Sequence, residues 1–387
     1  MTQRRPAPTH RQRRALRKVP VTMHKTPAMM RRTHAMQRII ADPLFPKVCA
    51  YLFPDVPAEE MAARFRSFRS VRDFQNGFMY SAVWSVAHQT TDGGTVEGME
   101  KLSPEARYLF VSNHRDIVLD AAILQVLLVD AGLPTSEITF GANLMQGQLV
   151  IDIGKSNKMF RVERPSTVTS PREFLQRSAY LSSYIRHTLL EKKESVWIAQ
   201  RNGRTKDGRD ATDQGIVKMF CMSGSADRAA SLAALNIVPV ALSYEWEPCD
   251  LLKARELLAA RTGMPYVKKP GEDLNSILTG ILQPKGRVHY RICDPITAED
   301  LRPFSSFPAS AFHRAVAALV DSRILPAREL YPNNAIAWDL LRGESGGSYT
   351  ETQREAFLRH LSEVDGEADA DALKEILLGM YAAPFEN

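Results

Sequence analysis

Between residues 108 and 120 the chain reads Tyr-Leu-Phe-Val-Ser-Asn-His-Arg-Asp-Ile-Val-Leu-Asp. Residues 108–112 are apolar, aromatic or β-branched and predict a buried strand, while residues 117–129 predict a mostly buried helix. One histidine and two carboxylates lie at the turn between them. In open α/β sheets, ligands bind in the crevice beyond the carboxyl ends of the strands. We therefore expect His114 to face a ligand site at the start of the helix.

A neutral imidazole at such a place can accept a proton, provided that a carboxylate fixes its tautomer. Asp120 lies six residues after His114, and on a continuous helix, at about 100° per residue, it would lie about 120° away from the face of the histidine. The pair can meet only if His114 lies in the preceding loop. Asp116 is the alternative, either as the cap of the helix or as the nearer partner. A lone histidine at a strand end is more often structural, so its context decides.

The segment from Asn113 to Asp120 resembles the signature of the glycerolipid acyltransferases (glycerol-3-phosphate and 1-acylglycerol-3-phosphate acyltransferases), a histidine followed after four residues by an aspartate. Five residues intervene here, and the wording looks like a bacterial subgroup in which the longer spacing is normal. The resemblance implies that His114 deprotonates an acceptor hydroxyl. It implies that Asp120, or else Asp116, orients the imidazole, and that Asn113 and Arg115 contact the substrate.

Three further segments resemble the later blocks of that family, in the same order. Residues 158–165 match an aromatic-rich turn, and the resemblance implies that the phosphate of the acceptor binds Arg164, with Arg161 as a second candidate. Residues 198–208 match the block that usually reads Glu-Gly-x-Arg, although an amide side chain stands in place of the glutamate. Residues 237–244 match an apolar strand with a central proline. Together the resemblance covers roughly residues 105 to 295.

The block at residues 198–208 has a physical reading of its own. Gly203 lies between Arg201 and Arg204, so backbone N–H groups can approach an anion while guanidinium groups bind it in a bidentate manner. A solvated basic loop is the alternative. Three basic clusters, each after an apolar run, favour a shared phosphate pocket over that alternative.

The middle of the chain alternates between strand and helix patterns. Strands are expected near residues 107–112, 136–140, 195–200, 237–243 and 287–292, and helices near residues 117–131, 172–192, 211–233 and 250–263. This alternation predicts an α/β fold with a central, mostly parallel sheet flanked by helices. The resemblance implies an arrangement like that of glycerol-3-phosphate acyltransferase, with helical N- and C-terminal extensions.

The 387 residues divide into four expected parts, with enough hydrophobic residues (44%) for a sizeable core. They are a disordered basic arm at residues 1–27, a helical region at 28–95, the acyltransferase α/β domain at 96–297 and a helical region at 298–387. No chemistry is assigned to the last part.

Helices within residues 28–90 are expected to break at Pro43, Pro46 and Pro54. Their apolar face, which includes Met36 and Ile39, suits either a membrane surface or, more commonly, the protein core.

The basic residues are unevenly distributed. Residues 1–41 hold 11 lysines and arginines and no acidic residue, so they carry +11 and leave −5 for the remainder of a chain whose net charge is +6. Such an arm can bind an anionic membrane or a nucleic acid, because both attract it by the same electrostatics. The acyltransferase-like blocks favour the membrane and disfavour nucleic acid. We expect a cytoplasmic protein that is peripheral at the cytoplasmic membrane.

The leading hypothesis is that the chain transfers a fatty acyl group from acyl-CoA or acyl-carrier protein to a hydroxyl of glycerol 3-phosphate or a lysophospholipid, in phospholipid biosynthesis. Backbone amides at the helix start are expected to stabilise the oxyanion. The four separated cysteines predict neither a disulfide framework nor a zinc site, and no cofactor or metal is expected beyond the thioester co-substrate. The alternatives are a non-catalytic lipid or nucleic-acid binding protein on the same fold, and an acyl-thioester hydrolase.

Overall fold

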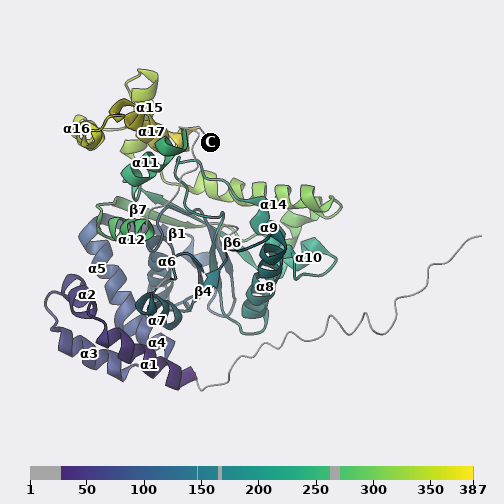
Figure 1. Cartoon of the computed structure of the whole chain (residues 1–387). Helices are drawn as coiled ribbons and strands as arrows, with labels where there is room; N and C mark the ends of the chain where they lie inside the picture. The colour runs from purple at the N-terminus through teal and green to yellow at the C-terminus, as the bar shows by residue number, and fades with distance from the viewer. Residues whose placement is uncertain (1–27, 146, 164–167, 262–270, 387) are drawn as a thin grey trace, which may run out of the picture.

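A computed structural model describes residues 28–145, 147–163, 168–261 and 271–386 of the chain (Figure 1). The strands of this described part form one seven-stranded sheet. They are β1 (Thr91–Glu97), β2 (Leu109–Ser112), β3 (Glu137–Gly141), β4 (Met159–Val162), β5 (Val196–Ala199), β6 (Ile237–Tyr244) and β7 (Gly286–Ile292).

The helices before and between the strands are α1 (Ala28–Ala41), α2 (Phe45–Leu52), α3 (Ala58–Ser67), α4 (Val71–Phe74), α5 (Tyr80–Thr90), α6 (Leu119–Asp130), α7 (Gln148–Ser156), α8 (Pro171–Leu190), α9 (Gln214–Cys221), α10 (Arg228–Ala233), α11 (Asp250–Arg261) and α12 (Glu272–Leu282). Those after the last strand are α13 (Ala298–Leu301), α14 (Ala309–Ile324), α15 (Pro332–Arg342), α16 (Glu351–Leu361) and α17 (Ala370–Ala382).

The strand order is β1-β7-β6-β2-β5-β3-β4. The neighbours among β6, β2, β5, β3 and β4 pair in parallel, whereas β7 is antiparallel to β6 and parallel to β1. The expected α/β fold, a mostly parallel sheet flanked by helices, is confirmed. Two strands of the sheet, β1 and β4, were not expected from the sequence.

Both faces of the sheet are covered, and side chains alternate between them along each strand. On β2, Leu109 and Val111 pack with α8, α9 and α14, whereas Phe110 packs on the opposite face with Leu124 of α6. Figure 1 shows α8, α9 and α14 on one side of the sheet and α5 and α6 on the other. Burial on both faces explains why the central strands read as continuous apolar runs.

The parallel strands determine where a site can form. Because β2, β5, β3 and β4 are neighbours with one direction, the loops after their carboxyl ends meet at a single edge of the sheet. Those loops begin at Asn113, Gln200, Ala142 and Glu163. All the segments that the sequence singled out for chemistry lead into this edge, and the block at 237–244 is among them because β6 is parallel to β2.

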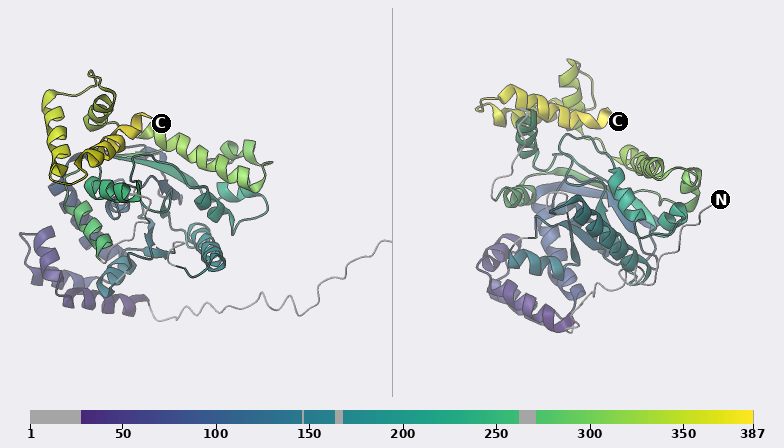
Figure 2. Two further views of the ribbon diagram at one scale, coloured as in Figure 1. Left: turned by 45° about the horizontal axis from the view of Figure 1, so that its top comes forward. Right: turned by 45° about the vertical axis from the view of Figure 1, so that its right-hand side comes forward.

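Helical regions lie at two ends of the molecule. Met36 and Ile39 of α1 are buried with aromatic residues of α3 and α4, so this face of α1 serves the core. A helix break was expected at Pro46, and this expectation is wrong. Pro46 lies in the first turn of α2, where its missing N–H costs little. At the other end, α15, α16 and α17 pack with α11 around a separate core (Figure 2).

None of the helices within the described ranges is long and apolar enough to cross a membrane. The basic arm expected at residues 1–27 lies outside the described residues.

Candidate active site

His114 lies in the loop between β2 and α6, and Asp120 lies in the first turn of α6. The imidazole Nδ1 is 2.8 Å from Oδ2 of Asp120. Because His114 precedes the helix, the 120° separation that a continuous helix would impose does not apply. The histidine side chain is 12% exposed and the carboxylate is fully buried. The chain therefore forms a histidine–aspartate pair at the carboxyl edge of the sheet.

The carboxylate of Asp120 is held by further donors. Its Oδ2 accepts the backbone N–H groups of Arg115 (2.6 Å) and Asp116 (3.0 Å), and its Oδ1 accepts the hydroxyl of Tyr244 (2.8 Å). Burial and the nearby Asp120 charge raise the pKa of Tyr244 far above its usual value, so the phenol stays a donor. Asp120 thus acts as an acceptor at both of its oxygens. Nδ1 of His114 therefore donates to it and carries the proton, and Nε2 is left as the base.

Asp116 does not contact the imidazole. Its Oδ1 accepts the backbone N–H groups of Val118 (2.8 Å) and Leu119 (2.7 Å), so it caps the start of α6. Its Oδ2 is buried and has no hydrogen-bond partner among the described residues. Burial, and then the charge of Asp120, raise the pKa of Asp116. Asp116 was expected either to cap the helix or to orient His114. In the structure it caps the helix, and Asp120 is the partner of His114.

The backbone amides at this helix start are already used. Those of Arg115 and Asp116 donate to Asp120, and those of Val118 and Leu119 donate to Asp116. The expectation that amides of this turn stabilise an oxyanion is therefore corrected for these four groups.

Asn113 and Arg115, expected to contact substrate, point into the protein instead. Asn113 bridges β2 to β6 through both backbone groups of Leu242, and it also donates to Asp210. The guanidinium of Arg115 pairs with Asp210 (2.7 Å) and Glu247 (3.0 Å) and is buried. The hydrogen bonds that these two side chains make within the described residues go to other protein groups, and Nε of Arg115 is buried without a partner there. The structure thus gives both residues structural contacts in place of the substrate contacts that were expected.

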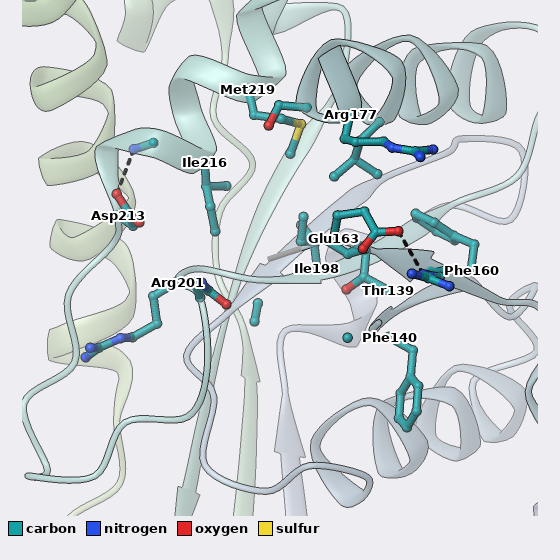
Figure 3. A pocket seen from close by; sticks show the side chains of 18 of the residues that line it. Thr139, Phe140, Phe160, Glu163, Arg177, Ile198, Arg201, Asp213, Ile216 and Met219 are labelled. Carbon is teal, nitrogen blue, oxygen red and sulfur yellow. Dashed lines mark hydrogen bonds and ion pairs between the residues drawn. The ribbon is translucent and has the colours of Figure 1, made fainter. Parts of the chain in front are cut away.

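A pocket of about 660 Å³ opens beside His114. It lies over the carboxyl ends of β3, β4 and β5, and helices α8 and α9 form its far wall (Figure 3). Most of its lining is apolar, including Phe140, Leu144, Phe160, Phe174, Leu175, Leu181, Ile198, Ile216, Met219 and Met222. An apolar chamber that reaches a partly buried base suits a ligand with a long hydrocarbon part.

Four cationic side chains belong to the same pocket: Arg161, Arg177, Arg201 and Lys218. Arg161 is 57% exposed and pairs with Glu163 at 2.8 Å. Arg177 and Lys218, on the two helices of the far wall, were not singled out from the sequence. Their helices carry the apolar spacing of core-packing segments, and nothing local indicates that α8 and α9 face a site.

The remaining substrate-binding candidates differ in whether they line the pocket. Gly203 lines the pocket with a φ of 80°, in the left-handed region that favours glycine. Arg204 is not in the lining; it is half-buried, and its Nη1 has no hydrogen-bond partner within the described ranges. Burial raises the pKa of Asp116 and the Arg204 charge opposes that rise, so Arg204 lies toward the capped turn. Arg164 lies outside the described residues.

Sequence reasoning missed two neighbours of the pair. The Trp197 ring meets the His114 imidazole edge-on, with centroids 5.9 Å apart, and its indole N–H donates to Ser112. Tyr244, the fourth donor to Asp120, closes the apolar block at residues 237–244. That block was recognised, and a tyrosine at the end of a strand beside β2 was the available signal.

A family model described as Acyltransferase matches residues 94–243, which include both His114 and Asp120. Among solved structures, the chain is similar to that of the 1-acyl-sn-glycerophosphate (LPA) acyltransferase, PlsC, from Thermotoga maritima, with 13% sequence identity and a TM-score of 0.39. That similarity covers 78% of this chain and 97% of that chain. No curated protein matches the chain. The family match confirms the resemblance to acyltransferases for this part of the chain.

Proposed function

We propose, from the premise of an acyltransferase domain at residues 94–243, that this protein moves a fatty acyl group from acyl-CoA or acyl-carrier protein to a hydroxyl of glycerol 3-phosphate or a lysophospholipid, as a step of phospholipid biosynthesis. The observation that carries the proposal is the His114–Asp120 pair on the wall of a largely apolar pocket with a cationic rim. The bacterial subgroup suggested by the Asn113 to Asp120 wording remains part of the same proposal.

The proposed step needs one base and one leaving group. Nε2 of His114 accepts the proton of the acceptor hydroxyl as its oxygen forms a bond to the thioester carbonyl carbon. Asp120 stabilises the imidazolium that results. When the tetrahedral intermediate collapses, the carbon–sulfur bond breaks and the imidazolium returns its proton to the departing thiolate. The products are an ester and a free thiol.

The pocket supports a division of the two substrates. An acyl chain would bury its methylene groups against the apolar wall, and each buried CH₂ contributes about 0.8 kcal/mol. Phosphate groups would meet cations at the rim, among them Arg161 and Arg201, where a guanidinium can bind two phosphate oxygens. Arg164 and Arg204 keep their proposed phosphate roles on sequence grounds alone.

The expected result with purified full-length protein is thiol release from palmitoyl-CoA that depends on an added acceptor, with one acylated lipid formed per thiol. Glycerol 3-phosphate and lysophosphatidate are compared side by side, with products followed by mass spectrometry. A thioesterase would release thiol without acceptor, since water would take the place of the hydroxyl. A binding protein would release none. Either of these outcomes contradicts acyl transfer as the function.

A second proposal concerns location: the arm at residues 1–27, with its eight lysines and arginines, holds the protein at the anionic cytoplasmic membrane. Each basic residue near such a surface is worth about 1 kcal/mol. Deleting the arm is therefore expected to weaken co-sedimentation with phosphatidylserine vesicles by about 100-fold or more, while thiol release from soluble substrates is unchanged. A variant with the eight residues changed to glutamine separates charge from length. Vesicle binding that survives both changes, or arm-dependent binding to DNA alone, would refute this proposal.

A further inference from the structure

A buried lysine lies behind the loop that carries His114. Lys253, in α11, has a side chain that is 1% exposed. Its ammonium donates to the backbone carbonyl of Arg115 (2.8 Å) and pairs with Glu247 (2.5 Å). Burying an ammonium is costly unless its donors find acceptors. One of those acceptors belongs to the residue directly after His114, so the lysine is joined to the loop of the site.

The carbonyl that Lys253 binds belongs to a peptide group that also serves Asp120. The N–H of that same peptide group, on Asp116, donates to Oδ2 of Asp120 at 3.0 Å. Hydrogen bonds polarise one another along a chain, and a cation on the carbonyl strengthens the donor at the other end of the peptide. Lys253, the 115–116 peptide, Asp120 and Nδ1 of His114 thus form one continuous series of contacts.

The opposite end of this series is anchored in the C-terminal helices. The backbone N–H of Glu247 donates to the hydroxyl of Tyr381, which in turn donates to Asp250 (2.7 Å). His360 of α16 contacts the same carboxylate oxygen of Asp250 at 2.6 Å. The region that received no chemical role from the sequence therefore holds the start of α11 and, through it, Lys253.

Stability alone does not account for a charge in this place. Burial lowers the pKa of Lys253, the Glu247 charge opposes that effect, and Arg204 and Arg115 add to the lowering. Replacing a buried ion pair with apolar residues of similar volume is often neutral or stabilising. What an apolar side chain cannot do is donate to the Arg115 carbonyl.

We propose that Lys253 is a positioning residue for the His114–Asp120 pair, acting through the peptide group between Arg115 and Asp116. The inference rests on the proposed acyl transfer, in which small displacements of the base are costly. A misplacement of about 1 Å can cost about 100-fold in rate.

The test replaces Lys253 with methionine in the full-length protein. The expected result is a kcat about 10- to 100-fold lower with little change in KM for donor and acceptor, because the pocket is intact and the base is misaligned. Because Glu247 loses a partner in this variant, K253M/E247Q is made beside it, so that a folded form without the ammonium can be measured. Both variants are expected to show the same loss of kcat.

Lys285 offers a matched control. It is also buried, and its ammonium donates to the carbonyl of Gln283 (2.6 Å) and the hydroxyl of Thr90 (3.1 Å). In the part of the chain that the structure describes it has no hydrogen bond to residues 113–120; burial lowers its pKa, and the charge of Asp116 opposes that effect. Lys285→Met removes an equally buried charge and is expected to lower thermal stability while the folded fraction keeps its kcat. If Lys285→Met lowers kcat as much as Lys253→Met does, positioning by Lys253 is disproved.

A second readout does not depend on activity. In protein labelled with ¹⁵N-histidine, the Nδ1–H signal of His114 is identified as the one missing from His114→Ala. We expect it to shift or broaden in K253M and to be unchanged in Lys285→Met. An unchanged signal in K253M overturns the inference. If the wild type shows no acyl transfer, the proposed function fails, and this signal still decides whether Lys253 positions the pair.

Discussion

Replacing His114 with alanine is expected to lower kcat for acyl transfer by about 10²–10⁴-fold, the usual contribution of a general base. The alanine variant lacks the imidazole, so no Nε2 atom is present to accept the hydroxyl proton. Donor and acceptor still meet in the pocket, so a residual rate above that of the reaction in water should remain. KM should change little, because most of the lining is contributed by other side chains. Initial rates of thiol release and product formation, measured at saturating donor and acceptor, give both parameters.

His187 provides the control for this experiment. It lies on α8, its Nδ1 also pairs with a carboxylate (Glu191, 2.9 Å), and its side chain is 55% exposed. His187→Ala removes a histidine–carboxylate pair that is not at the pocket, so it is expected to keep the wild-type rate. A His114→Ala variant that folds normally and retains full kcat would show that the reaction uses another base.

The central strands could be predicted because their signal is local. Burial on both faces makes β2, β5 and β6 continuous apolar runs. The edge strand β1 has no such signal, since Thr91–Glu97 is polar, contains two glycines and is mostly exposed. It is a strand because β7, almost two hundred residues later, pairs with it. Pairing between distant segments cannot be read from the sequence of one of them.

The single helix expected at residues 211–233 is two helices in the structure, and a local capping residue explains the difference. The structure divides it into α9 and α10, with Asp227 as the cap of the second helix through the backbone N–H of Ala230. The apolar residues on both sides keep helical spacing, so the break was hidden. Aspartate before a helical run is a start signal that the pattern did contain.

The sequence allowed the residue types of the site to be predicted. It did not allow us to predict where their side chains point. The His114 segment gave a base and two carboxylates, and the geometry that separates Asp120 from Asp116 depends on where α6 begins. Arg115 stands next to the histidine in sequence, yet its partners Asp210 and Glu247 lie 95 and 132 residues away. Neighbours in a loop point in different directions, and only the folded chain supplies the distant groups that decide which way.

Changing Asp120 to asparagine is the second large effect that we expect, a loss of about 10²–10⁴-fold in kcat, similar to that of removing the base. An asparagine that turns its NH₂ toward Nδ1 favours the tautomer with the proton on Nε2, which cannot act as a base. It also sets that NH₂ among other donors, since Oδ2 of Asp120 accepts two backbone N–H groups. Leaving buried groups unsatisfied costs about 1–3 kcal/mol of stability. Kinetics and urea unfolding measure the two losses separately.

Asp116→Asn is the matched comparison, because it makes the same chemical change four residues earlier. An asparagine can still accept the N–H groups of Val118 and Leu119 through its oxygen, so kcat should stay within about threefold. Its effect on stability has the opposite sign. Because the pKa of Asp116 is raised in the folded protein, the folded state holds its proton more tightly than the unfolded state, and stability falls as the pH rises above the ordinary carboxyl pKa. Asparagine removes that penalty, so Asp116→Asn should gain stability relative to wild type with rising pH in this range. A loss of kcat in Asp116→Asn equal to that in Asp120→Asn would mean that hydrogen bonding to His114 does not distinguish the two carboxylates.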